Sequence, residues 1–583
     1  MRHKLEGWGA AVLLAVAGCP GPVEGTATGA SGEATGSSTE SASSTGSEST
    51  TTTTTTGEPT TTTGEPPFDG VIASAVRTYR PLGGGAVEVV HDPLTWLASL
   101  EIEAGGQSFP GQFDGVDRLR FAGVPEGPYL LRQQYAPDPL VPGVPGRLVG
   151  AVTSARELGN FAGTYAGRPG VAQTDDPATE IALWATGMPA LGPEDQFEIY
   201  SYNADAQLLV FPDLDPMASD GSPGLGDTVI EGWSIPWRPD TVRSGWPLVE
   251  EDDDLWLGLL VAGRLVENPT PAQLQDAWSY AQVYRLGARA PLTLAGPMTA
   301  GATTTASGAF SPIEARTVTI DLRAGEFMAE LQIYDSALKS VGCFVAVVLE
   351  PGLEQPILAV TPNLGGVNVF GQDVPVDPMC PPDACDPEAC ESCETMFVLP
   401  GDRVLEVPYG NPYEGGTETL YVQCSRYVFV PEPDGEGYDW LASDLVVSGR
   451  LEALAQGPIA PKMGLVRDLA VNGTKLGPEE TLAGVGTTPT ITFTAPAYGA
   501  PDVYSVIVRS IDDVAGLEGV SERRTVATIR TAFTSLTLPE GILEPGGHYY
   551  VAVAAEYGRE LAGAMATSHE MYISRAITGV FTP

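Results

Sequence analysis

Short apolar runs follow one another along this chain from residue 68 onward, and most of them alternate apolar with polar side chains. Gly, Pro, Asp or Asn residues break the pattern about every 8 to 12 residues, which is the spacing of strands and turns in β-sandwiches. Runs of this kind cover residues 86–90, 97–102, 129–132, 180–184, 197–202, 256–261, 317–322, 345–349 and 421–430. The pattern predicts an all-β fold built from several tandem β-sandwich domains.

One segment has helical spacing instead. Thr270 stands where a helix N-cap would lie, and Leu274, Ala277, Trp278 and Ala281 follow at intervals that share one helical face. We expect a helix of at most about three turns here, although its later half also fits a strand.

Residues 1–18 combine basic side chains near the start with an apolar run from Ala10 to Ala17. The run is too short to cross a bilayer, which takes about 20 apolar residues, so it is typical of a cleaved signal peptide. Small residues directly precede Cys19, and together they resemble the lipobox of bacterial lipoproteins. The resemblance implies that Cys19 is acylated and anchors the protein in a lipid bilayer. An ordinary secretory signal is the alternative.

Residues 19–67 are a low-complexity segment of Ser, Thr, Gly and Glu, with threonine runs at 50–56 and 60–63. Such a composition buries too little apolar surface to offset the entropy of ordering the chain. We therefore expect a disordered tether after the lipidated cysteine. Pro20 stands where an inner-membrane retention signal would have Asp, which favours the outer membrane or cell surface of the bacterial envelope.

Breaks rich in Gly, Pro and Thr divide the remaining chain into four expected units, at residues 68–165, 166–290, 291–456 and 457–583. Within the first unit, residues 119–131 read LRFAGVPEGPYLL. This stretch resembles one found in transthyretin-like sandwiches. The resemblance implies that a tight turn brings Phe121 and Tyr129 into one core.

The C-terminal unit carries the longest resemblance to a known family. Residues 491–496 read ITFTAP and residues 504–508 read YSVIV, matching the second and third strands of a fibronectin type III domain. Three further residues have the spacing of that family's tyrosine corner: Leu543, Pro545 and Tyr549. The resemblance implies an immunoglobulin-like sandwich over residues 457–583, with the Tyr hydroxyl bonded to nearby backbone. Phe493 departs from the family, which usually has Trp there.

Seven cysteines occur in the chain, and an even number remains besides Cys19. In an exported protein this number indicates disulfides. We expect three disulfides stapling residues 291–456, formed among six candidates whose pairing the sequence leaves open: Cys343, Cys380, Cys385, Cys390, Cys393 and Cys424. A four-cysteine zinc site is the alternative, because Cys390 and Cys393 have CxxC spacing.

Acidic residues outnumber basic ones by 74 to 30, which leaves a formal net charge of −44. We therefore expect no nucleic acid partner, because binding a polyanion requires basic surface. Calcium prefers oxygen ligands, and one Gly/Ser/Pro-rich loop offers carboxylates, although their spacing matches no standard calcium loop. These calcium candidates are Asp213, Asp215, Asp220 and Asp227.

The sequence carries no metalloprotease, nucleophile-elbow, phosphate-loop or dinucleotide-binding motif and has only four histidines. We therefore expect a non-catalytic surface protein, a binding, adhesion or structural module with a protein or glycan ligand and no cofactor. The alternative is a carbohydrate- or polymer-active hydrolase that uses two carboxylates within residues 166–290. That region also holds tryptophans suited to lining a cleft: Trp184, Trp233, Trp237, Trp246 and Trp256.

Overall fold

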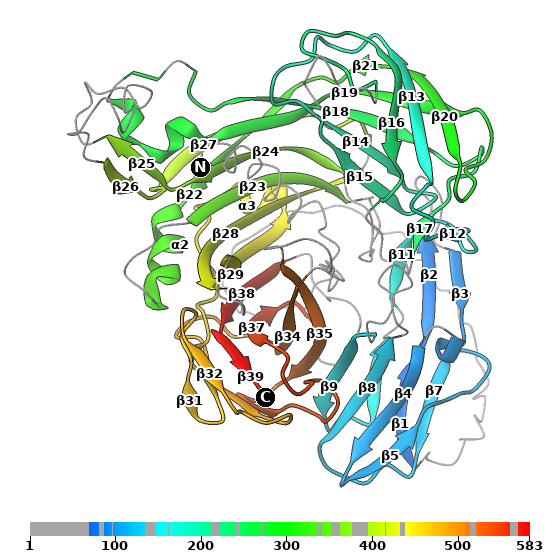
Figure 1. Ribbon diagram of the computed structural model, residues 1–583, viewed down its shortest axis with the longest axis vertical. Helices are drawn as coiled ribbons and strands as arrows, with labels where there is room; N and C mark the ends of the chain where they lie inside the picture. The colour runs from blue at the N-terminus through cyan, green and yellow to red at the C-terminus, as the bar shows by residue number, and fades with distance from the viewer. Residues whose placement is uncertain are drawn as a thin grey trace, which may run out of the picture.

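The folded body is built almost entirely of β-strands, as the sequence predicts (Figure 1). The computed structural model describes residues 69–80, 87–95, 97–135, 146–160, 163–212, 221–239, 245–267, 269–270, 272–334, 341–350, 362–375, 395–413, 416–431, 438–513, 521–559 and 570–583. The expected signal peptide and tether lie outside these ranges.

The first expected unit holds eleven strands within the described ranges. They are β1 (Gly70–Ser74), β2 (Val76–Arg80), β3 (Val87–Val90), β4 (Leu97–Ala104), β5 (Gln107–Pro110), β6 (Gln112–Phe113), β7 (Arg118–Ala122), β8 (Tyr129–Tyr135), β9 (Leu148–Thr153), β10 (Glu157–Asn160) and β11 (Thr164–Ala166). Strand β7 shows how the alternation works, because Leu119 and Phe121 are fully buried while Arg118 points outward. Phe121 and Tyr129 share one core, and between them the chain turns through Gly123 and Gly127, both at positive φ.

The second expected unit forms a two-layer sandwich that extends past its expected end at residue 290. The sandwich has ten strands within the described ranges, and the last two of them lie beyond that residue. The ten strands are β12 (Gln173–Thr174), β13 (Glu180–Thr186), β14 (Gln196–Ser201), β15 (Ala206–Val210), β16 (Ile230–Pro236), β17 (Trp246–Pro247), β18 (Trp256–Arg264), β19 (Gln282–Leu294), β20 (Thr303–Ala309) and β21 (Ser311–Pro312). One layer holds β16, β13 and β20, and the other holds β15, β14, β18 and β19. Their inner faces meet in one core, where the rings of Phe197 and Trp233 lie edge to face with centroids 5.3 Å apart.

The expected helix after Thr270 is wrong. The segment instead forms two short 3-10 turns, Gln273–Gln275 and Ala277–Tyr280. Asp276 separates them because its backbone is extended and its side chain accepts a hydrogen bond from the Trp278 amide at 3.1 Å. This local cap competes with helical hydrogen bonding.

The third expected unit carries the remaining helices and the longest strands. Its strands are β22 (Arg316–Leu322), β23 (Val341–Glu350), β24 (Asn363–Phe370), β25 (Gln372–Pro375), β26 (Thr395–Val398), β27 (Arg403–Tyr409), β28 (Thr417–Pro431) and β29 (Tyr438–Arg450), and its helices are α2 (Ala324–Leu331) and α3 (Leu451–Leu454). The helical residues Phe327 and Leu331 are fully buried in the large core behind β23 and β28. Helix α2 therefore covers one face of the long sheet.

The fourth expected unit is again two-layered. Its strands are β30 (Arg467–Val471), β31 (Thr474–Lys475), β32 (Thr481–Ala483), β33 (Thr490–Thr494), β34 (Val503–Asp513), β35 (Ser521–Thr531), β36 (Ser535–Thr537), β37 (Tyr549–Tyr557), β38 (Met571–Ile577) and β39 (Val580–Thr582). A small sheet, in the order β31-β30-β33-β36, packs on a sheet in which β35, β34, β37 and β38 are neighbours. Between the layers, the ring centroids of Phe493 and Tyr504 lie 5.0 Å apart.

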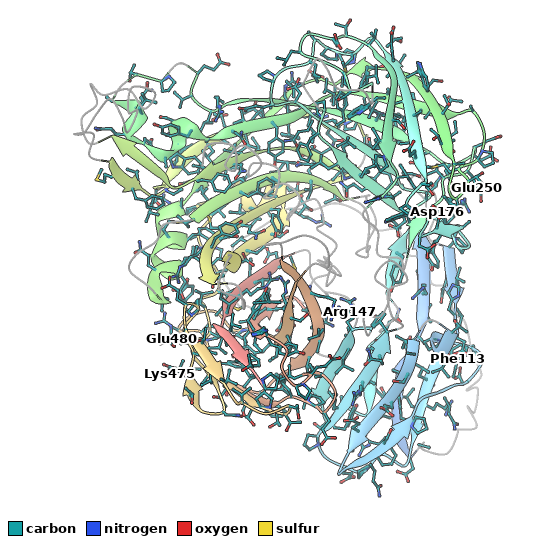
Figure 2. All side chains as sticks on the ribbon, in the orientation of Figure 1. Phe113, Arg147, Asp176, Glu250, Lys475 and Glu480 are labelled. Atoms are coloured by element: carbon teal, nitrogen blue, oxygen red, sulfur yellow. A yellow bond between two sulfur atoms is a disulfide. The ribbon has the colours of Figure 1, made fainter. Side chains whose placement is uncertain are left out.

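Strand pairing joins the second expected unit to the third, the third to the fourth, and the first to the fourth. Strand β19 pairs with β24, and β29 pairs with β38. Strand β9 of the first unit runs parallel to β35 of the fourth, with Leu148 opposite Ala527; Arg147, labelled in Figure 2, immediately precedes β9. A single core accordingly contains residues from Leu148 to Phe581. The four units thus share hydrogen-bonded sheets, and the chain curves round until its first and last units meet (Figure 1).

Candidate functional site

One disulfide lies in the described part of the third unit, between Cys343 and Cys424. The two residues face each other on the neighbouring strands β23 and β28, with Cα atoms 4.1 Å apart. Both side chains are buried, so the bond cross-links the two strands within the protein interior. The other four candidates, Cys380, Cys385, Cys390 and Cys393, lie outside the described residues, as does Cys19.

The three tyrosine-corner residues lie at the entry to β37. Leu543 and Tyr549 are buried, and Pro545 lies in the turn between them. The Tyr549 hydroxyl accepts a hydrogen bond from the Glu544 amide at 2.9 Å. An ideal Cβ at Gly547 would lie 2.6 Å from that hydroxyl, so the corner needs a residue without a side chain there.

Asp227 is the one calcium candidate that the structure describes; Asp213, Asp215 and Asp220 lie outside the described residues. The Asp227 carboxylate accepts a hydrogen bond from the Gly224 amide at 2.8 Å and so closes a turn of its own loop. Within the described ranges no group of three or more His, Cys, Asp or Glu side chains is arranged to hold a metal ion.

The five tryptophans of the second unit lie in different surroundings. Trp233 and Trp237 are buried in the core of the sandwich, where the Trp237 indole donates to the Pro247 carbonyl at 2.8 Å. Trp246 packs at the edge of that core. Trp184 is exposed on the outer face of β13, and the fifth, Trp256, belongs to an enclosed polar cluster.

That cluster fills the junction between the second and third units. We call it the Glu198 cluster, and its members come from β14 and the turn after it, β18, β19 and the segment after β27: Glu198, Tyr200, Tyr202, Trp256, Arg289 and Tyr413. The hydroxyls of Tyr200 and Tyr413 are hydrogen-bonded at 2.8 Å. The Arg289 guanidinium lies 4.3 Å from the Trp256 ring centroid and 5.0 Å from that of Tyr413. Contacts of this kind are cation–π attractions, which are strongest where water is excluded.

Glu198 is the titratable centre of the cluster. Burial raises the pKa of its carboxyl to about 7, although a hydrogen bond from Gln207 and the nearby Asn363 amide partly offset that rise. No described residue makes a hydrogen bond to its buried Oε2 within normal geometry. Burial also raises the pKa of Tyr200 and of Tyr202 well above the ordinary range, so both phenols stay neutral at physiological pH. The cluster thus contains a carboxyl that gains and loses its proton near neutrality.

The neighbouring acidic run is tied into the same unit. Arg168 donates to Asp253 at 2.8 Å and to Glu250 at 2.9 Å, and Glu250 is labelled near the foot of this unit in Figure 2. Asp254 accepts a hydrogen bond from the Asn203 amide at 2.8 Å, yet burial raises the pKa of its carboxyl. These carboxylates hold loops in place, and each is engaged by donors from its own unit.

A second polar network joins the third unit to the fourth. On β29, Asp444 accepts hydrogen bonds from Ser425 at 2.8 Å and Gln423 at 3.3 Å, both on β28. Its other oxygen accepts from Arg575 of β38 at 2.8 Å. Tyr421 donates to Gln423 at 2.9 Å and extends the network along β28. The Asp444 side chain is 6% exposed and that of Arg575 is 30% exposed, so the ion pair is largely enclosed.

Both networks were missed from the sequence. Their only local signal is polar residues at alternate positions of otherwise apolar strands, such as Gln423 and Ser425 on β28 and Glu198 on β14. Which partner each one meets depends on strands far away in the chain. The Asp444 network pairs donors with acceptors across the joint between the third and fourth units, which rigidifies that joint. The Glu198 cluster differs, because the buried Oε2 of Glu198 has no hydrogen-bond partner among the described residues.

The comparisons with known proteins found no match, either to a family model or to a curated protein. A search of the described residues also found no helix of the length and apolar character needed to cross a membrane.

Proposed function

We propose that this protein is a bacterial envelope lipoprotein whose folded body binds a partner, or serves as a structural module, without catalysis. The observation that carries the proposal is the order of the first 67 residues: a short apolar run, small residues before Cys19, and then an apolar-poor segment. That order fits an acylated cysteine followed by a tether. Pro20 after the cysteine favours the outer membrane or cell surface.

Three features of the folded body support a non-catalytic role outside the cytosol. The disulfide between Cys343 and Cys424 suits an oxidising compartment. The enclosed carboxylates Glu198, Asp254 and Asp444 hold parts of the protein together. Loops at sandwich ends and outward sheet faces are left to carry a binding surface, since these positions vary without disturbing a core.

The fourth unit supports the resemblance to fibronectin type III domains. Its two layers meet at the rings of Phe493 and Tyr504, and the Tyr549 hydroxyl is bonded to nearby backbone. Binding domains of this architecture contact their partners through loops and sheet faces, so the resemblance fits an adhesion or binding role.

Metabolic labelling of cells with a radioactive fatty acid tests the anchor. The wild-type chain should carry the label in the membrane fraction, and Cys19→Ala should lose it because the acylated sulfur is gone. The double variant Cys343→Ala/Cys424→Ala is the matched control and should keep the label. Equal labelling of wild type and Cys19→Ala would reject the lipoprotein proposal.

The hydrolase alternative rests on Glu198, whose pKa of about 7 suits a general acid. Its carboxyl is 1% exposed, however, and a catalytic acid has to reach its substrate. We therefore expect purified wild type to release no reducing ends from soluble polysaccharides. If wild type released reducing ends and Glu198→Gln did not, that result would instead establish the hydrolase.

A further inference from the structure

The outer face of the second unit's sandwich carries an exposed tryptophan among polar side chains. We call it the Trp184 face, and it comprises the outward side chains of β13, β16 and β20 around the indole: Glu180, Trp184, Ser234, Thr303, Thr305 and Ser307. Trp184 sits on the central strand, opposite Glu231 on one side and Ser307 on the other. In Figure 1, β13 and β20 lie at the outer edge of this unit.

The sheet is shaped to support the indole. Leu183 pairs with Trp233 and Trp184 with Glu231, which leaves Gly232 as the extra residue of a β-bulge at a φ of 79°. An ideal Cβ at Gly232 would lie 3.1 Å from the Trp184 ring. A glycine at the bulge therefore lets the ring lie close against the backbone, as a platform over the sheet.

Exposure of this ring is unusual within the protein. Trp184 is 42% exposed, more than any other tryptophan whose side chain the structure describes. Neighbouring Leu183 and Ala185 are buried in the core, so their strand is anchored beneath the ring. An aromatic ring left partly in water on a rigid sheet is typical of a contact surface.

The groups around the ring are hydrogen-bonding and lack positive charge. Glu180 accepts from Ser234 at 2.8 Å and from Thr303 at 3.1 Å, so its carboxylate is held in one orientation. Thr305 and Ser307 are exposed to solvent on the neighbouring strand β20. No Lys or Arg occurs in β13, β16 or β20.

We propose that the Trp184 face binds neutral carbohydrate. A sugar ring offers an apolar C–H face that stacks on an indole and a rim of hydroxyls that pair with carboxylates and hydroxyls. An anionic ligand would be repelled by Glu180 and Glu231, and a protein partner needs roughly 800 Å² of surface, usually with several apolar anchors. The inference deepens the proposed binding role, rests on it, and names its ligand class.

The test is co-sedimentation of the full chain carrying Cys19→Ala with three insoluble neutral polysaccharides: cellulose, chitin and curdlan. Wild-type sequence at the face should bind at least one of them. Trp184→Ala should weaken that binding by at least about tenfold, the loss typical of an aromatic anchor, and Trp184→Tyr should restore part of it. The matched control is Phe533→Ala, which removes another exposed ring, 53% exposed, from the fourth unit.

Because Trp184 lies outside the core, Trp184→Ala should keep the wild-type urea midpoint, and this measurement shows that lost binding is not lost folding. Binding that is equal in wild type and Trp184→Ala overturns the site. Failure to bind any of the three glycans also overturns it. If the chain binds none of the glycans but is still retained by cells or envelope proteins, the proposed binding role stands without this site. If nothing retains the chain, the carbohydrate site and the binding role are both rejected.

Discussion

Neutralising Glu198 should stabilise the protein at alkaline pH and not at acidic pH. The pKa of its carboxyl is raised by burial from 4.5 to about 7, so the folded state holds the proton more tightly than the unfolded chain does. Its favourable contribution is complete below about pH 4.5 and is lost as the pH rises through 7. A difference of about 2.5 pH units corresponds to about 3 kcal/mol. Glu198→Gln keeps the shape and the acceptor for Gln207 but carries no charge.

Urea unfolding followed by tryptophan fluorescence at several pH values measures the effect. The stability of Glu198→Gln relative to wild type should rise by up to about 3 kcal/mol between about pH 5 and 8. The control is Glu314→Gln, which removes a carboxylate at an exposed position. A stability difference for Glu198→Gln that does not change with pH would refute the reasoning that burial penalises its charge.

Three further variants test the tyrosine corner, the disulfide and the polar network between the third and fourth units. Tyr549→Phe should lower the stability of the fourth unit by about 1 kcal/mol, because one partly exposed hydrogen bond is lost. Amide hydrogen exchange in that unit should become faster, and unchanged exchange would show that the corner has no structural role. Cys343→Ala/Cys424→Ala should cost about 4 kcal/mol, because the bond closes a loop with a sequence separation of 81, and an unshifted urea midpoint would contradict this. Asp444→Asn should cost about 1 to 3 kcal/mol by leaving the Arg575 charge without its partner; hydrogen exchange in β38 should rise, and Arg575→Met in the same background should recover part of the loss.

Local patterns predicted the strands well. Leu119 and Phe121 alternate with polar neighbours, and that period of two is enough to place them on the buried side of a strand. The long apolar run in β23 similarly reads as a strand covered on both faces. The segment after Thr270 was predicted wrongly as a helix because a single side-chain cap, from Asp276, outweighed the apolar spacing.

The candidate site was harder to predict than the fold. The even cysteine number indicated disulfides, but only the neighbouring positions of β23 and β28 show that Cys343 meets Cys424. The tryptophans were grouped because they are close in sequence, whereas the sandwich turns Trp233 into its core and Trp184 out to solvent. Side-chain direction depends on strand register, which a bulge such as the one at Gly232 shifts by one residue.

The sequence by itself determined that this is an all-β chain behind an apolar-poor segment, because strand alternation and the inability to bury apolar surface are properties of neighbouring residues. Only the tertiary structure decided that β9 lies beside β35 and that Asp444 meets Arg575. Those contacts join residues far apart in the chain, and their partners are selected by the packing of whole sheets. Local sequence carries no record of such long-range pairing, so it left open how the expected units are joined.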